Sequence, residues 1–301
     1  MRIIHLSDTH LDRTDAPNRH GVNATESLRL MLGELRHQRD VDAVFVTGDI
    51  ADDGAVEAYT TARELITEFA RRWAAPVFFT TGTPDEREAF GKVLGSGHLT
   101  ADGTERAEAV IGSARSERAA VSTVGGWRVV TLDSLVPGKV HGWLADEQLG
   151  WLREVLATPA DAAHGTILAF HHPPLALDVE TQRVFGLRNP DALADVIRGS
   201  DVRVVLTGHF HLQLFGLLAQ VPVWVTPGVV NRIDLTTPPG TERAVRGASA
   251  SLVELGGATG PMFHTFHARD PCAHETVYEL DEERTRELIE RYAGADGSRN
   301  S

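Results

Sequence analysis

A recurring event constrains this chain more than any other feature: a short apolar run ends directly in aspartate or histidine. The first run, residues 3–6 (Ile-Ile-His-Leu), is followed by Ser-Asp-Thr-His, which places Asp8 and His10 two residues apart. Alternate residues of an extended backbone point the same way, so we expect the Asp8 carboxylate and the His10 imidazole to leave a strand end side by side. Oxygen and nitrogen ligands of this kind suit a divalent metal such as Zn, Mn or Fe.

The same event occurs four more times along the chain. Apolar runs over 41–47, 76–81, 166–170 and 202–206 lead to Asp49, to the Gly-Thr-Pro-Asp turn at 82–85, to His171, and to His209 and His211. Helical spacing over 24–39 and 55–73 separates the first three runs and predicts βαβ units with parallel strands. Because ligands of such sheets gather at the carboxyl ends of the strands, we expect all these polar side chains at one edge.

The remaining segments predict a second sheet. Residues 127–133 have the pattern of a strand, 145–157 and 190–199 those of helices, and 95–126 hold two short strands at most. Strands follow around 212–218, 221–226, 249–255 and 262–267, a loop rich in Gly, Pro and Arg covers 238–247, and a helix covers 281–292. We therefore expect a mostly antiparallel second sheet and an α/β fold, a four-layer αββα sandwich of two mixed sheets flanked by helices. Residues 1–293 form one domain in this interpretation, and 294–301 a disordered tail.

Composition argues against several classes of protein. With 301 residues, 42% of them hydrophobic, the chain can bury a large core, and no apolar run reaches the length of a membrane span. The start of the chain lacks the regions of a signal peptide, so we expect a soluble cytoplasmic protein. The net charge of −13 argues against a general nucleic-acid binder. The single cysteine, Cys272, excludes an internal disulfide and a thiolate-rich zinc site.

Six Asp and His residues at strand ends predict a metal centre better than any one of them alone. A single histidine in an apolar setting is usually structural. Six such residues on one sheet edge favour a two-metal site, in which Asp49 bridges two cations roughly 3.5–4 Å apart. Such a pair clamps a phosphate and lowers the pKa of a bound water, so the pattern predicts a phosphate-ester hydrolase with two divalent metal ions as cofactors.

These motifs resemble those of the calcineurin-like metallophosphoesterases over residues 3–255. They are Asp8-x-His10, Gly48-Asp49, Gly82-x-x-Asp85, His171 in His-His-Pro-Pro, and Gly208-His209-x-His211. The His-His-Pro-Pro form and the segments 136–138 and 198–203 are most similar to the bacterial class III cyclic-nucleotide phosphodiesterase branch, which also contains glycerophosphodiesterases. The resemblance implies two ligand sets: Asp8, His10, Asp49 and His211 for metal one, and Asp49, His171, His209 and a ligand from the Gly82 turn, here Thr83, for metal two.

The resemblance also implies an activity. The chain would hydrolyse a phosphodiester, first of all 3′,5′-cyclic AMP, by attack of a metal-bound hydroxide, with Asp49, His171 and His209 as catalytic residues. A glycerophosphodiester or another small phosphate ester is the alternative substrate. A weakened relative that binds a nucleotide or a partner without turnover is the alternative from another class. We expect no nucleic-acid or membrane partner, and since members of this branch often dimerise, a homodimer stays open.

The Gly82 turn departs from the family pattern, which reads Gly-Asn-His-Asp/Glu. Thr83 offers a hydroxyl in place of the amide oxygen, and Pro84 has neither an imidazole nor a backbone N–H. Either metal two is bound weakly, with water or Asp85 filling the gap, or the site is retuned to another substrate or metal. Deliberate inactivation is a third interpretation, disfavoured because it usually installs Ala. Losing one general acid costs about 10²–10⁴-fold in rate, so reduced activity is expected.

Three further residues complete the prediction. His141, in a Gly-rich loop, and Arg232 are candidates for contact with the substrate. His172 follows a predicted ligand on an extended strand, so we expect it to face away from the metals in a supporting role.

Overall fold

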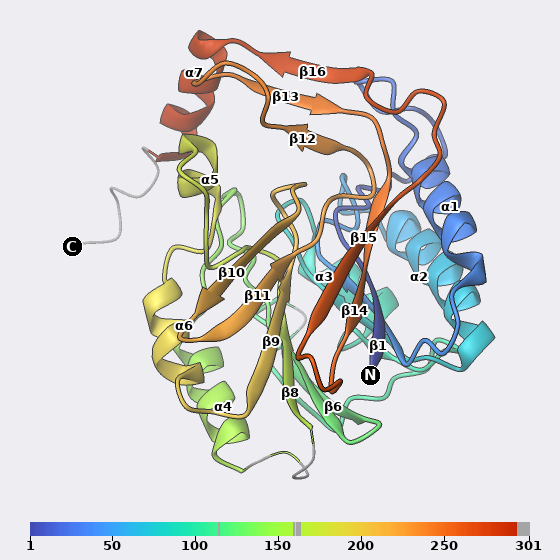
Figure 1. Cartoon of the computed structure of the whole chain (residues 1–301), viewed down its shortest axis with the longest axis vertical. Helices are drawn as coiled ribbons and strands as arrows, with labels where there is room; N and C mark the ends of the chain where they lie inside the picture. The colour runs from blue at the N-terminus through green and yellow to red at the C-terminus, as the bar shows by residue number, and fades with distance from the viewer. Residues whose placement is uncertain (114, 159, 161–163, 294–301) are drawn as a thin grey trace.

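Two large β-sheets form the centre of the computed structural model, which describes residues 1–113, 115–158, 160 and 164–293. Helices cover the outer face of each sheet, and a third, small sheet lies across one end (Figure 1). The predicted four-layer αββα sandwich is confirmed. The predicted tail, 294–301, lies outside the described residues.

The first large sheet has six strands in the order β15-β14-β1-β2-β3-β4. Its strands are β1 (Arg2–Leu6), β2 (Ala43–Thr47), β3 (Val77–Thr80), β4 (His98–Leu99), β14 (Ser249–Glu254) and β15 (Met262–His267). The first three are parallel, as the βαβ pattern predicts, and the others are antiparallel. Three helices cover one face: α1 (Ala24–Glu34), α2 (Val56–Ala70) and α3 (Arg87–Leu94).

The second large sheet has seven strands in the order β10-β11-β9-β8-β7-β6-β5. They are β5 (Ala109–Ile111), β6 (Ala119–Val124), β7 (Trp127–Thr131), β8 (Gly165–Ala169), β9 (Val202–Thr207), β10 (Leu214–Leu218) and β11 (Val221–Val225). Its four central strands are parallel, so the expectation of a mostly antiparallel sheet is wrong. The segment 95–126 holds three short strands, where at most two were expected. Helices α4 (Asp146–Ala157) and α6 (Pro190–Ile197) pack on this sheet.

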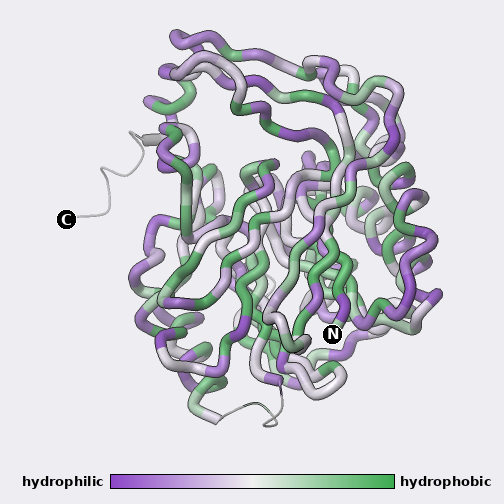
Figure 2. The backbone as a smooth tube through the Cα atoms, in the orientation of Figure 1, coloured by the Kyte–Doolittle hydropathy of each residue, from purple (hydrophilic) through white to green (hydrophobic). Residues whose placement is uncertain are grey.

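Side-chain alternation along the central strands produces the layers. In β1, Ile3 belongs to the apolar cluster between the two sheets, which also contains Ile167 and Leu206. Its neighbour Ile4 points the other way and belongs to the apolar cluster under the helices, which also contains Leu28 of α1. Strands with both faces buried read as continuous apolar runs, which explains why β1, β2 and β3 are evident in the sequence. Figure 2 shows this hydrophobic colouring along the central strands.

The third sheet lies beyond the carboxyl ends of the central parallel strands (Figure 1). It consists of β12 (Arg232–Asp234), β13 (Glu242–Val245) and β16 (Thr276–Leu280), with α5 (Glu180–Phe185) and α7 (Glu282–Ala293) nearby. The expected loop over 238–247 is therefore wrong across β13. These strands are short, and most of their residues are only partly buried, so they lack the apolar periodicity that identifies a strand. In the part of the chain that the structure describes, no helix has the length and apolar character of a membrane span.

Candidate metal centre

The loops that follow β1, β2, β8 and β9 meet at one edge of the two sheets. Backbone hydrogen bonds join the first two loops, since the Asp8 N–H donates to the Gly48 carbonyl (3.1 Å) and the His10 N–H to the Asp49 carbonyl (2.9 Å). The His209 N–H donates to the Asp8 carboxylate (Oδ2, 3.0 Å), which ties the loop after β9 to the loop after β1. The fold therefore brings the ends of these strands together, as the sequence predicts.

Five of the predicted ligands have left-handed backbone conformations. Their φ angles are 56° at Asp8, 46° at His10, 48° at Asp49, 70° at His209 and 51° at His211. Such angles are uncommon outside glycine and cost about 1–3 kcal/mol each, and they cluster at functional sites. They also correct the reasoning from extended strands. Strand β1 ends at Leu6 and β9 at Thr207, so the ligand pairs are brought together by tight loops and not by strand alternation.

The first cluster consists of Asp8, His10, Asp49 and His211. The Nε2 atom of His10 lies 3.4 Å from Asp49 Oδ2 and 3.3 Å from His211 Nε2, which in turn lies 3.3 Å from Asp8 Oδ1. Two ligand atoms of a tetrahedral Zn²⁺ ion are about 3.3–3.4 Å apart. The donor set and its spacing therefore fit a divalent ion, and this is the set that the motifs predict for metal one.

The outer nitrogens of both imidazoles are held by oxygen atoms. His10 Nδ1 is 2.8 Å from Asp52 Oδ1, and His211 Nδ1 is 2.7 Å from Asn231 Oδ1. An acceptor on one ring nitrogen keeps the hydrogen there, so the lone pair of the other nitrogen faces the cluster. Asp52 and Asn231 are supporting residues that no motif identifies.

Negative charge dominates the electrostatics of this edge. Burial opposes protonation of His10, but Asp52, Asp49 and Asp8 outweigh it and raise the pKa of His10 to about 9. Burial likewise opposes protonation of His171, and Asp49 raises its pKa to about 9. Burial alone would raise the pKa of Asp49, yet the nearby His171 and His10 lower it well below its usual value. A site that draws protons onto its imidazoles in this way also attracts metal cations.

The second cluster surrounds His171, which is fully buried. Its Nδ1 donates to the Thr47 carbonyl (2.6 Å), and its Nε2 lies 2.8 Å from Asp49 Oδ1 and 3.0 Å from His209 Nδ1. The two carboxylate oxygens of Asp49 thus face different clusters, Oδ2 toward the first and Oδ1 toward the second. This is the geometry that a bridging carboxylate requires.

His172 also faces the second cluster, contrary to expectation. Strand β8 ends at Ala169, so the alternation of an extended strand does not continue to His172. The His172 ring lies 4.8 Å from the His171 ring and 4.5 Å from the His209 ring, centroid to centroid. Its Nε2 is 3.1 Å from the Thr83 hydroxyl. The sequence-based placement of His172 away from the cluster is therefore wrong.

The turn at 82–85, which differs from the family pattern, is anchored by its backbone and by Asp85. The Thr83 N–H donates to Asp49 Oδ1 (2.5 Å), which holds the turn against the cluster. Asp85 accepts hydrogen bonds from the Gly82 N–H (2.7 Å), the Ala51 N–H (2.9 Å) and the Tyr59 hydroxyl (2.9 Å). Its carboxylate is committed to these donors, so the interpretation in which Asp85 replaces the missing ligand finds no support in the geometry.

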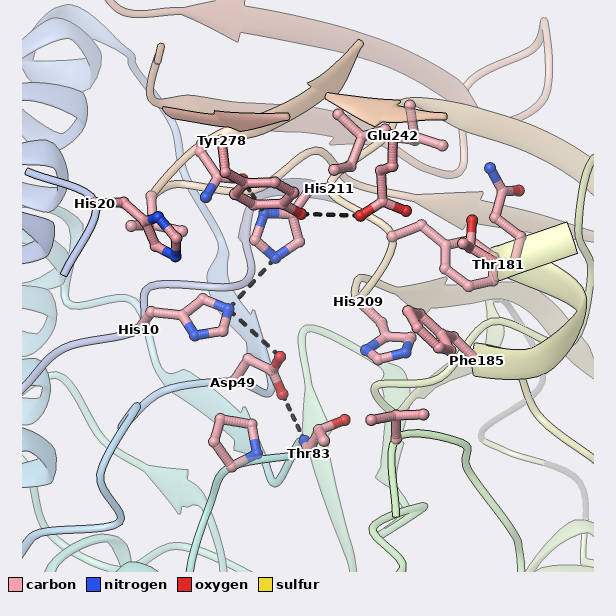
Figure 3. Close-up of a pocket in the computed structure, with 18 of the residues that line it drawn as sticks. His10, His20, Asp49, Thr83, Thr181, Phe185, His209, His211, Glu242 and Tyr278 are labelled. Carbon is pink, nitrogen blue, oxygen red and sulfur yellow. Dashed lines mark hydrogen bonds and ion pairs between the residues drawn. The ribbon is translucent and has the colours of Figure 1, made fainter. Parts of the chain in front are cut away.

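A cavity of about 620 Å³ opens over the first cluster. Figure 3 shows His10, Asp49 and His209 on one side of it, Tyr278 and Glu242 of the third sheet on the other, and His211 between His10 and Tyr278. The Tyr278 hydroxyl donates to Glu242 (3.0 Å), and the Tyr278 ring lies 5.4 Å from the ring of His20. Sequence reasoning missed Tyr278 and Glu242, because it did not predict the third sheet that brings them to the metal cluster.

Neither of the two predicted substrate contacts, Arg232 and His141, lines this cavity. Arg232 is absent from the lining of this cavity and lines a neighbouring one with Arg243 and His274. His141 is buried, and its neighbour Val140 lines the cavity in its place. Because His211 of the first cluster lines both cavities, contact of Arg232 with a substrate stays a prediction, as does that of His141.

Comparison with known proteins agrees with this geometry. The family model for calcineurin-like phosphoesterases matches residues 1–213. A probable cyclic nucleotide phosphodiesterase of Rhodococcus erythropolis is 37% identical over 251 residues, which cover 82% of this chain and 76% of that protein. A cAMP/cGMP dual specificity phosphodiesterase of Mycobacterium tuberculosis is 36% identical over 292 residues, covering 92% of this chain and 87% of that protein.

A similar fold occurs in a solved structure of low sequence identity. The dimetal phosphatase from Danio rerio superposes with a TM-score of 0.55 at 15% identity, over 89% of this chain and 99% of that one. This likeness concerns the fold alone, whereas the family model and the two relatives concern the sequence. On that sequence evidence, the chain belongs to the calcineurin-like phosphoesterase family.

Proposed function

We propose that this protein is a two-metal phosphodiesterase that hydrolyses a 3′,5′-cyclic nucleotide, with cyclic AMP as the first candidate. The observation that carries the proposal is Asp49, whose two oxygens face two separate groups of ligand atoms. Phosphate-ester hydrolases use this arrangement to hold two ions side by side. The relatives named cyclic nucleotide phosphodiesterases support the choice of substrate.

The residues of this chain have distinct parts in the proposed centre. Asp8, His10, Asp49 and His211 would hold one divalent ion, and Asp49, His171 and His209 the other, with Mn, Fe and Zn all suited to such donors. When bound, the ions would polarise the phosphate and make a water nucleophilic. Asp52, Asn231 and the Thr47 carbonyl hold the imidazoles in place through their Nδ1 atoms.

The cavity is suited to a small molecule with an aromatic part. Its volume of about 620 Å³ lies in the usual range for small-ligand sites. Phe185, His20 and Tyr278 contribute aromatic rings to its lining, and Glu242 contributes a carboxylate. A base could stack on such rings while the phosphate lies at the clusters.

Thr83 and Pro84 set an expected limit on the rate. The turn has no imidazole that could protonate the leaving oxygen. Hydrolysis of a substrate whose leaving group needs a proton should therefore be slower by about 10²–10⁴-fold. A p-nitrophenolate leaving group needs no proton, so the rate of hydrolysis of a p-nitrophenyl ester should not be reduced. The ratio of the hydrolysis rates of the two kinds of substrate therefore measures the effect of Thr83 and Pro84.

The test compares cyclic AMP with bis(p-nitrophenyl) phosphate on the metal-loaded chain and on Pro84→His. We expect both substrates to be hydrolysed, and the substitution to raise kcat for cyclic AMP at least tenfold more than kcat for the activated ester. Glycerophosphocholine serves as the rival substrate. Faster hydrolysis of that compound than of cyclic AMP would reject the choice of substrate, and no hydrolysis of any of the three would reject the enzyme.

A further inference from the structure

Three imidazoles, not two, lie at the second cluster, and those of His171 and His172 are fully buried. We propose that His172 is a ligand of the second metal ion and takes the place of the amide oxygen that the Thr83 turn lacks. This inference rests on the proposed two-metal centre and gives the second site a nitrogen-rich donor set: His171, His172 and His209 beside Asp49.

His172 is oriented in the same way as the ligands of the clusters. Its Nδ1 lies 2.8 Å from the Ser134 hydroxyl oxygen, just as His171 Nδ1 is held by Thr47. The proposal requires the tautomer with the hydrogen on Nδ1, in which the lone pair of Nε2 points inward. Neutral metal-ligating histidines typically make such a contact from their outer nitrogen. The backbone at Gly142 packs closely against His172 and restricts its position, since a Cβ added to Gly142 would lie 2.5 Å from the His172 Cβ.

The spacing of the donors suits a single ion. One ligand atom from each of His171, His172 and His209 lies within 4.8 Å of the others. His172 Nε2 also lies at hydrogen-bond distance, 3.1 Å, from the Thr83 hydroxyl oxygen of the turn. Nε2 thus lies beside the position that the turn would otherwise supply with an amide oxygen. Both His171 and His172 are fully buried, which excludes a solvated role for the ring.

The exchange of oxygen for nitrogen has a consequence for metal choice. Imidazole ligands suit Zn²⁺, whereas carbonyl oxygens suit Mn²⁺. The second site of this chain should therefore favour Zn²⁺ over Mn²⁺ more strongly than a site with an amide oxygen would. The Thr83-Pro84 turn would then accompany a retuned metal site and not a lost one.

Calorimetric titration of the metal-stripped full chain with Zn²⁺ and with Mn²⁺ tests the proposal. Wild type should bind two Zn²⁺ ions, and His172→Phe should bind one ion as before and the other at least tenfold more weakly. Adding Thr83→Asn to His172→Phe should restore the second ion and lower its preference for Zn²⁺ over Mn²⁺. Unchanged affinity for both ions in His172→Phe, or an unchanged preference in the double variant, would overturn the proposal.

His98→Phe is the matched control. His98 is also buried and also lies between two hydroxyl groups, those of Ser122 and Thr131, at 2.7 and 2.8 Å. A merely structural His172 would behave like His98, with lower stability and normal metal binding. Nitrogen-15 NMR of Zn²⁺-loaded wild type needs no variant: five metal-bound histidine nitrogens support the proposal and four overturn it. A wild type that binds fewer than two ions would reject the proposed two-metal centre itself.

Discussion

The backbone at Gly48 has no room for a side chain, and Gly48→Ala should therefore disturb both stability and metal binding. A Cβ at this position would lie 2.5 Å from His171 Nδ1, about 0.9 Å closer than an ordinary contact of 3.4 Å. The φ angle of Gly48 is +79°, a left-handed conformation that costs alanine about 1–2 kcal/mol. Displacing a well-packed ring adds about 1–3 kcal/mol. The expected loss of unfolding free energy is the sum, about 2–5 kcal/mol.

Gly199→Ala separates the two contributions. Gly199 has a similar φ of +71°, but no atom lies within 4 Å of its added Cβ, so only the backbone cost of about 1–2 kcal/mol remains. Urea unfolding of the metal-free chains measures both variants, and calorimetry measures their affinity for Zn²⁺. Gly48→Ala should lose at least tenfold in affinity because His171 is pushed from its place, whereas Gly199→Ala should bind normally. Equal stability and equal metal affinity in the two variants would refute the reasoning.

Two further predictions concern groups away from the clusters. Arg87→Ala should lower the unfolding free energy by about 3–5 kcal/mol, because the buried Asp133 carboxylate, 2.7 Å from Arg87, loses its charged partner. Arg198→Ala removes one member of an exposed pair with Asp195 and should change the unfolding free energy by no more than about 1 kcal/mol. Similar losses for the two variants in urea unfolding would contradict this prediction. His98, whose pKa burial lowers to about 3, binds a proton in the unfolded chain but not in the folded one between pH 6.5 and 3. Stability should therefore fall as pH falls through this range, by up to about 1.4 kcal/mol per unit for this group, and His98→Phe should show a shallower slope in urea unfolding against pH; an unchanged slope would exclude this role.

Much of the fold could be predicted because its central strands are buried on both faces. Strands β1, β2 and β3 appear as apolar runs, and α1 and α2 separate them with a helical period. The parallel centre of the second sheet was missed although a signal existed. Helix α4 lies between β7 and β8, and a parallel pair needs a crossover of this kind.

The candidate ligands could be predicted from their positions at strand ends, but their geometry could not. The left-handed angles at Asp8 and His211 depend on contacts between loops far apart in the sequence. His172 was misplaced because the alternation rule was extended past the last residue of β8. Glu242 and Tyr278 lie in strands with no apolar periodicity, so no local pattern points to their place at the cavity.

The number of Zn²⁺ ions bound per chain, in wild type and in Asp49→Ala, tests the two-metal centre most directly. Asp49 faces both clusters with its two oxygens, so removing it should affect both sites. Equilibrium dialysis followed by elemental analysis should find two ions per wild-type chain and less than one in Asp49→Ala. A wild-type chain with a single ion, or a variant that keeps one ion at full occupancy, would contradict a centre that shares this carboxylate.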